Sequence, residues 1–181
     1  QVHHNYLGYV LAIEGTVQDS VGPFTIAVGQ AAHAKHPFRI GDRLRGMCAP
    51  VENPETETSR YYRVSGIAFL EGGPEPASTA GPPFHRTAPP LEEYRALGHR
   101  RLSPARHDTE CRTCVWACRM PVEIVVDQWK PQNKRYRVET FCYGPDDCPL
   151  YKAGPKRVVP GRKGMKYTET VEDRDIRLGR V

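Results

Sequence analysis

Five of the six cysteines lie in one short stretch of the chain, where they form two close-set clusters. The first cluster reads Cys111-x2-Cys114-x3-Cys118, and the second reads Cys142-x5-Cys148. Short spacings of this kind let neighbouring thiolates turn toward one ion. The interval between the clusters has the pattern of a strand, a polar turn and a second strand, so a hairpin would return the second cluster beside the first. The pattern predicts a metal centre with thiolate ligands.

Four of these cysteines suffice for a closed tetrahedral zinc site, in which all ligands are protein side chains. The predicted ligands are Cys111, Cys114, Cys142 and Cys148. The order of cluster, hairpin and cluster resembles a zinc ribbon, in which two knuckles at the open end of a hairpin hold one Zn²⁺. The chain departs from that pattern in the five-residue spacing of its second cluster and in its extra thiol, Cys118, which this interpretation packs near Trp116.

A 4Fe-4S cluster is the alternative cofactor. The first three cysteines are closely spaced, Cys142 or Cys148 supplies a fourth thiolate, and Cys148-Pro149 is similar to the Cys-Pro ending of some ferredoxin motifs. This alternative uses Cys118 as a ligand. His107, four residues before Cys111, is a further candidate, although an exposed loop histidine is the simpler interpretation. The remote Cys48 is interpreted as a structural thiol.

The clustering of the thiols also bears on compartment and activity. Secreted domains held by disulfides have paired, dispersed cysteines, so this distribution favours reduced thiolates in the cytoplasm. No apolar run approaches the roughly 20 residues that span a bilayer, which predicts no membrane partner. The chain also lacks a phosphate-binding loop, a dinucleotide glycine fingerprint and a nucleophile elbow. We therefore expect a binding protein without enzymatic activity.

Residues 1–70 predict a mostly β domain. Short runs of β-forming residues at 6–16, 23–28 and 60–70 alternate with turns, and residues 30–36 suit a short helix. Gly41-Asp42 suits a tight turn. Several short strands with one helical insert resemble the OB-fold, a small five-stranded barrel used widely for nucleic acids. The resemblance predicts an N-terminal β-barrel.

The rest of the chain divides into three predicted segments. Residues 71–105 are a linker, whose first twenty residues are rich in proline and glycine and form an extended strap. We expect Phe84 and His85 of this strap to dock on a neighbouring surface. A short helix follows Pro90. Residues 106–151 are the cysteine-rich module. Residues 152–181 are a basic extended tail, and we expect its last residues, 169–181, to fray.

The positive charge is concentrated in the cysteine-rich module and the tail. Residues 106–166 carry 13 Lys or Arg against 7 Asp or Glu, whereas residues 1–70 carry 6 against 6. This distribution favours a polyanion, and we expect RNA or DNA, with RNA preferred, within a ribonucleoprotein or larger protein complex. The predicted phosphate contacts are Lys130, Lys134, Arg135, Arg137, Lys152, Lys156, Arg157, Arg162, Lys163 and Lys166. Candidates for stacking on unpaired bases are Trp129, Tyr136 and Tyr143.

Two other functions fit the same residues. An iron–sulfur protein would carry electrons or serve as a subunit of a redox complex. A structural subunit would present its basic surface to an acidic protein instead of a nucleic acid.

Overall fold

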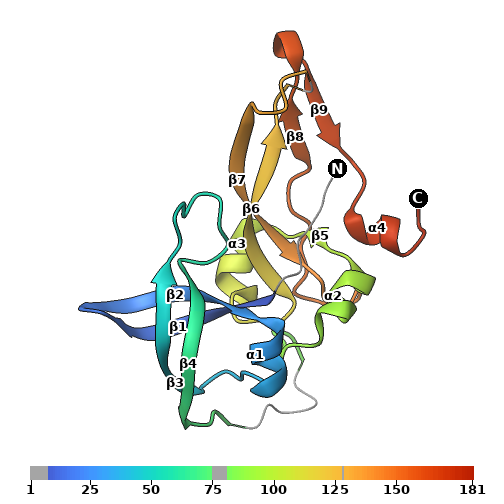
Figure 1. Cartoon of the computed structure of the whole chain (residues 1–181). Helices are drawn as coiled ribbons and strands as arrows, with labels where there is room; N and C mark the ends of the chain where they lie inside the picture. The colour runs from blue at the N-terminus through green and yellow to red at the C-terminus, as the bar shows by residue number, and fades with distance from the viewer. Residues whose placement is uncertain (1–7, 75–80, 128) are drawn as a thin grey trace. The chain divides into compact units, whose positions relative to one another are not determined.

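The computed structural model describes residues 8–74, 81–127 and 129–181 (Figure 1). The chain is mostly β, as predicted, and it divides into two compact units. The first contains residues 8–74 and Arg86–Leu91, and the second contains residues 81–85 and Glu92–Val181. The predicted linker therefore contributes to both units, although its residues 75–80 lie outside the described part of the chain.

The first unit is built on one four-stranded sheet with the order β1-β2-β4-β3. Its elements are β1 (Gly8–Val17), β2 (Ser20–Gly29), α1 (Gln30–Lys35), β3 (Arg43–Pro50) and β4 (Tyr61–Glu71). The predicted strands and the predicted helix are thus present. The two-residue turn after β1 puts Gln18 at a φ of 53°, and Gly41 has a φ of 89° at the predicted turn before β3.

The sheet of the first unit is open, so the prediction of a closed barrel is wrong for the residues that the structure describes. β1 pairs only with β2, and β3 pairs only with β4. The two hairpins meet through a single parallel pairing, Ile26 with Tyr61. Closure would need β1 to pair with β3, and the described residues of these two strands do not pair.

A small aromatic cluster covers part of this sheet. His33 of α1 lies between Tyr9 and Phe38, with ring centroids 4.1 Å and 5.8 Å away, and Phe38 stacks on Phe69. The segment 86–91 returns to the same cluster, because the hydroxyl of Tyr9 donates to the carbonyl of Pro89. Phe38 and His33 are the buried members of this cluster.

The second unit contains a three-stranded sheet, β5-β7-β6, and a two-stranded sheet, β8-β9. Its elements are α2 (Leu91–Leu97, whose first residue belongs to the first unit), β5 (Arg100–Arg101), α3 (Pro104–Arg106), a π-helical turn (His107–Cys111), β6 (Ala117–Val125), β7 (Lys134–Cys142), β8 (Arg157–Pro160), a 3₁₀ turn (Arg162–Gly164), β9 (Lys166–Glu169) and α4 (Asp173–Arg177). The predicted hairpin between the cysteine clusters is β6–β7.

The tail is more ordered than the sequence suggests. Residues 157–169 form the β8–β9 hairpin, and the end of the chain forms α4 instead of fraying. α4 is anchored by Arg174, whose side chain is buried although it is charged. The backbone N–H of Arg174 donates to the carbonyl of His99, and its Nη1 donates to the carbonyl of Gly144.

Candidate metal centre

The β6–β7 hairpin brings the two cysteine clusters together. Cys111 ends the π-helical turn, and hydrogen-bonded turns from Cys111 to Cys114 and from Cys114 to Ala117 lead into β6. Ala117 is the register partner of Cys142, the last residue of β7. Cys148 follows in a turn closed by its N–H to the carbonyl of Pro145. Both clusters therefore lie at the same open end of one hairpin, as the spacing predicts.

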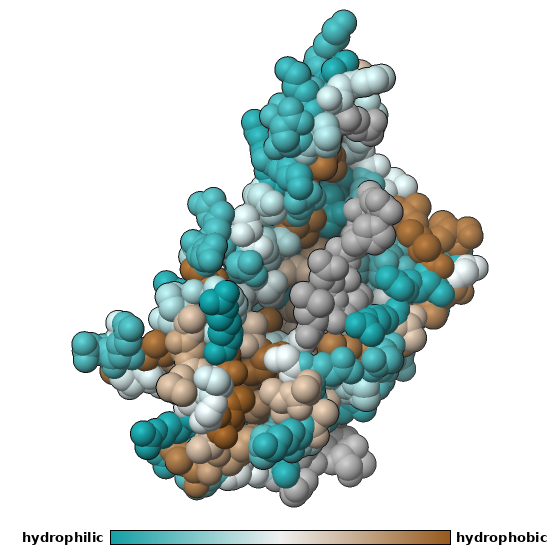
Figure 2. All heavy atoms as spheres, viewed as in Figure 1, coloured by the Kyte–Doolittle hydropathy of each residue, from teal (hydrophilic) through white to brown (hydrophobic). Residues whose placement is uncertain are grey.

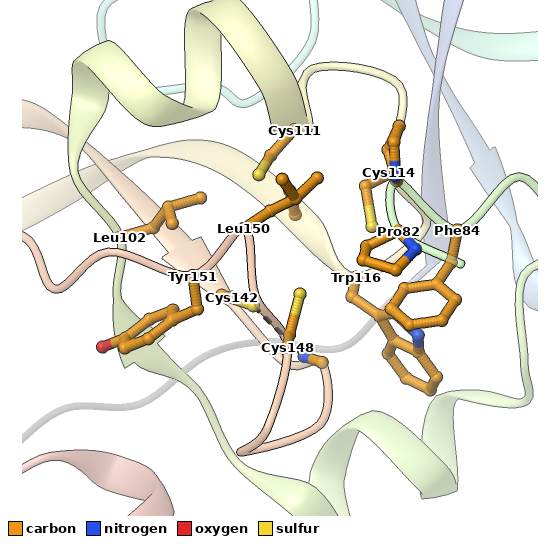
Figure 3. Close-up of a pocket in the computed structure, with 13 residues that line it drawn as sticks. Pro82, Phe84, Leu102, Cys111, Cys114, Trp116, Cys142, Cys148, Leu150 and Tyr151 are labelled. Atoms are coloured by element: carbon orange, nitrogen blue, oxygen red, sulfur yellow. Dashed lines mark hydrogen bonds between the residues drawn. The ribbon is translucent and has the colours of Figure 1, made fainter.

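Four cysteines line a single small cavity inside the second unit (Figure 3). They are the four predicted primary ligands: Cys111, Cys114, Cys142 and Cys148. The remaining walls are almost entirely apolar side chains and glycine, namely Pro82, Pro83, Phe84, Leu102, Trp116, Ala117, Gly144, Leu150 and Tyr151. The cavity has a volume of about 10 Å³, which is space for about one water molecule.

The four thiols influence one another, as groups around one centre must. Burial, together with the charges of Cys114, Cys142 and Cys148, raises the pKa of Cys111 to about 11. Burial also raises the pKa of Cys114. All six cysteines of the chain are free thiols. A metal that binds Cys111 and Cys114 must therefore displace their protons, and that displacement makes metal binding depend on pH.

Backbone N–H groups already point at two of the sulfur atoms. Gly144 donates to the Sγ of Cys142 at 3.3 Å. The backbone N–H groups of Trp116 and Phe84 form hydrogen bonds with the sulfur of Cys114 and lower its pKa, opposing the effect of burial. Hydrogen bonds of this kind stabilise thiolates and tune thiolate-bound metal centres.

Cys118, the alternative ligand, does not line the cavity. It lies in β6 directly after Ala117, and successive side chains of a strand point to opposite faces of the sheet. Cys118 therefore shares a face with its register partner Phe141, which is fully buried. Burial raises the pKa of Cys118 to about 12. Cys48 belongs to β3 of the first unit.

The predicted docking of the strap is present within the second unit. The carbonyl of Phe84 accepts a hydrogen bond from the N–H of Val115, and His85 is 2.7 Å from the hydroxyl of Thr113. Both partners belong to the turns around Cys114, and Phe84 forms one wall of the cavity. The strap therefore closes one side of the thiol cavity.

Two buried arginines hold the loop that carries the second cluster, and no local sequence pattern predicts either role. Arg100 of β5 donates to the carbonyls of Gly144 and Pro145. Arg174 of α4 donates to the carbonyl of Gly144 and to Asp146, at 2.6 Å and 2.9 Å. These contacts span 28 to 45 residues of sequence, so only the tertiary fold reveals them.

His107 takes no part in the cavity. It is buried, not exposed as expected, and its Nδ1 lies 2.9 Å from Asp108. Among residues 8–74, 81–127 and 129–181, no group of three or more His, Cys, Asp or Glu side chains has the close approach that holds one metal ion. The four thiols thus surround the cavity, but their sulfur atoms are not close enough together to bind a single metal ion in this arrangement.

The ten predicted phosphate contacts fall into three groups. Lys134, Arg137 and Arg162 are exposed or half-buried and form ion pairs with Glu123, Glu139 and Asp127 respectively. Arg157 is buried and bonded to Glu139 and Glu169, so its charge is used inside the protein. The other six are exposed: Lys130, Arg135, Lys152, Lys156, Lys163 and Lys166.

The three aromatic candidates for base stacking differ in their exposure to solvent. Tyr143 is buried against Tyr94, with ring centroids 5.2 Å apart, so it belongs to the core. Trp129 is 76% exposed and Tyr136 is 43% exposed. Tyr167, which sequence reasoning missed, is 54% exposed on β9.

Comparison with known proteins adds no relative: no protein-family model matches the chain, and no curated protein or solved structure is significantly similar to it. Among the helices that the structure describes, none is long and apolar enough to cross a bilayer.

Proposed function

We propose that the chain is a non-enzymatic iron–sulfur protein whose 4Fe-4S cluster is held by Cys111, Cys114, Cys142 and Cys148. The observation that carries this proposal is the shape of the site: four thiols around one apolar cavity. Four thiolates are the usual protein ligands of such a cluster. With a thiolate on every iron, the cluster has no open position for a substrate, which favours electron transfer or a structural role.

The spread of the sulfur atoms bears on whether the cavity holds a cluster or a single zinc ion. In a closed zinc site each sulfur is about 2.3 Å from the metal, so tetrahedral sulfurs are about 3.8 Å apart and leave no space for a water molecule between them. The present cavity holds about one water molecule and must widen to admit the eight atoms of a cluster, so its volume alone does not select either group. In a cluster the thiolates bind different iron atoms and are spread more widely, which suits thiols that surround a space.

Apolar walls and directed N–H groups also suit a cluster. The side chains of Trp116, Phe84 and Tyr151 line the cavity and limit the access of water. Backbone N–H groups of neighbouring residues donate to the sulfur atoms of Cys142 and Cys114, and such bonds favour a thiolate ligand. Solvent exposure and hydrogen bonds to sulfur are among the features that set the potential of an iron–sulfur centre. Because such thiols must stay reduced until they are loaded, the proposed compartment is the cytoplasm.

Zinc is the second candidate, and the observation that favours it is the arrangement of the hairpin. The two clusters flank the open end of β6–β7, as the knuckles of a zinc ribbon do. Zinc binding would require the four thiols to close on one point. The second unit would then be a ribbon-like module stapled by Zn²⁺ instead of a cluster-binding module.

Anaerobic reconstitution of the full chain with iron and sulfide tests the proposal. We expect about four iron and four sulfide per chain, with broad visible absorption that dithionite bleaches. The variants C111S, C114S, C142S and C148S should each lose most of the absorption, whereas C118S and C48S should retain it. A colourless protein with one tightly bound zinc per chain would overturn the cluster and support the zinc site. Equal loss in C118S and C142S would contradict the ligand set.

A further inference from the structure

The turns of two hairpins in the second unit are joined into one surface. Arg162, in the turn between β8 and β9, places its Nε 3.1 Å from Asp127 at the end of the β6–β7 hairpin. The same guanidinium lies over the ring of Trp129, 5.2 Å from its centroid. Figure 1 shows these two hairpins extending together at the same end of the second unit. We call five exposed residues of the two turns and of the start of β9 the tip surface: Trp129, Lys130, Lys163, Lys166 and Tyr167.

The tip surface carries more positive charge than its neighbours neutralise. Asp127 is paired with Arg162. Lys130, Lys163 and Lys166 are exposed, and among the described residues none of them has an acidic partner within 4.0 Å that the structure records. No Asp or Glu occurs between Pro149 and Thr168. Figure 2 shows this end of the second unit as mainly hydrophilic. Three cations at adjoining turns form a local site for a polyanion.

Flat aromatic rings lie among these cations. The side chain of Trp129 is 76% exposed and that of Tyr167 is 54% exposed. An exposed tryptophan makes little contribution to the fold, and exposed aromatics next to Lys and Arg are the combination that binds unpaired bases: the rings stack on the bases and the cations contact the phosphates. An acidic peptide would use the charges and leave both rings without a function.

We propose that the tip surface binds single-stranded nucleic acid. Bases stack on Trp129 and Tyr167, and Lys130, Lys163 and Lys166 contact the phosphates between them. Two further exposed cations, Lys152 and Lys156, precede β8 and lie outside the two turns, and the exposed Arg135 lies on β7. This site uses none of the thiol ligands, so it does not depend on which metal the cavity holds.

Fluorescence anisotropy of a labelled 20-nucleotide oligouridylate with the full, metal-loaded chain tests this site. K163Q/K166Q removes two phosphate contacts, so the slope of log affinity against log salt should fall by about 1.4. K152Q/K156Q removes the same charge outside the tip surface and should leave the slope nearly unchanged. Equal effects of the two double variants would show general attraction to a basic protein and overturn the site.

A separate substitution, of Trp129, tests whether bases stack on the aromatic residues of the tip surface. W129A should weaken binding by about five-fold or more, because one stacked base contributes about 1–3 kcal/mol, and the salt slope should stay unchanged. W129F should restore most of the affinity. The proposal is overturned if W129A binds like the wild type, if a duplex of equal length binds more tightly, or if polyglutamate displaces the RNA as well as unlabelled oligouridylate does. Absence of binding at 50 mM salt would also overturn it. Visible absorption of the same samples shows separately whether the metal centre is intact.

Discussion

The guanidinium carbon of Arg100 lies 3.7 Å from the centroid of the Tyr151 ring. Tyr151 is one wall of the thiol cavity, and its hydroxyl donates to the carbonyl of Arg101. On its other side Arg100 donates to the carbonyls of Gly144 and Pro145, between the last two cysteines. One buried cation thus fixes both a wall of the cavity and the loop that carries Cys142 and Cys148.

Replacing Arg100 should therefore destabilise the second unit. R100Q removes the cation over Tyr151 and the donors to two loop carbonyls, and hydrogen bonds from a charged group contribute about 1.5–3 kcal/mol each. We expect the free energy of unfolding, measured in urea on the metal-free chain, to fall by about 2–3 kcal/mol. R119Q is the control, because the exposed Arg119 is 3.9 Å from its nearest acid, and its cost should stay within about 0.5 kcal/mol. Equal losses in the two variants would refute this role of Arg100.

The half-buried Cys118, whose thiol has a raised pKa, should make the metal-free protein less stable in alkali. Burial raises its pKa to about 12 from an ordinary value of 9.0. Above pH 9 the unfolded chain releases this proton while the folded chain retains it, so stability is full below pH 9 and falls as the pH rises further. Urea unfolding between pH 8 and 10.5 should show a steeper decline for the wild type than for C118S. Parallel curves would mean that Cys118 is not buried in solution.

Local patterns predicted that the two cysteine clusters meet, because this proximity depends on a hairpin. Alternating β-formers on both sides of a polar turn required strands near β6 and β7, and antiparallel pairing then brings Cys114 and Cys142 to the same end. The absence of Cys118 from the cavity also follows from the strand pattern, because successive side chains of a strand point to opposite faces and β6 begins at Ala117. The sequence alone did not fix that starting residue, so Cys118 remained an alternative ligand.

The wrong predictions for the tail and for the barrel have a common physical cause, because both features depend on contacts between residues that are distant in the sequence. A run of basic residues predicts a solvated tail, yet Arg157 and Arg174 are buried because acids and carbonyls on other elements meet them. No local signal marks such a pairing. Closure of a barrel likewise depends on whether β1 meets β3, and local patterns predicted a strand for β1 but not for β3.

Glu139 should make stability depend on pH in acid. Burial would raise the pKa of this carboxyl, but hydrogen bonds and charge from Arg157 and Arg137 outweigh it, so its pKa is lower than the ordinary 4.5. The stabilisation is present above pH 4.5 and is lost as the pH falls through the lowered value. Between pH 3 and 6, the unfolding free energy of the metal-free wild type should fall more steeply than that of E139Q. A constant difference between the two across this range would assign the effect to other carboxyls.

Gly98 should tolerate no side chain, because it ends α2 and also contacts α4. Its φ is 68°, a left-handed conformation that stabilises the end of a helix and favours glycine. A Cβ at this position would lie 2.9 Å from the Cα of Arg174. G98A should therefore reduce the free energy of unfolding by about 3 kcal/mol, through backbone strain of about 1–2 kcal/mol and displacement of α4.

G179A separates these two causes. Gly179 has nearly the same φ, 63°, but a Cβ there would meet no atom within 4 Å, so only the strain applies and the cost should be at most about 1–2 kcal/mol. If α4 moves in G98A, Arg174 loses its bond to the carbonyl of Gly144 and the loop before Cys148 loosens. Reconstituted G98A should then release its metal to a chelator faster than G179A does. Equal release rates in the two variants would show that α4 does not hold the thiol loop.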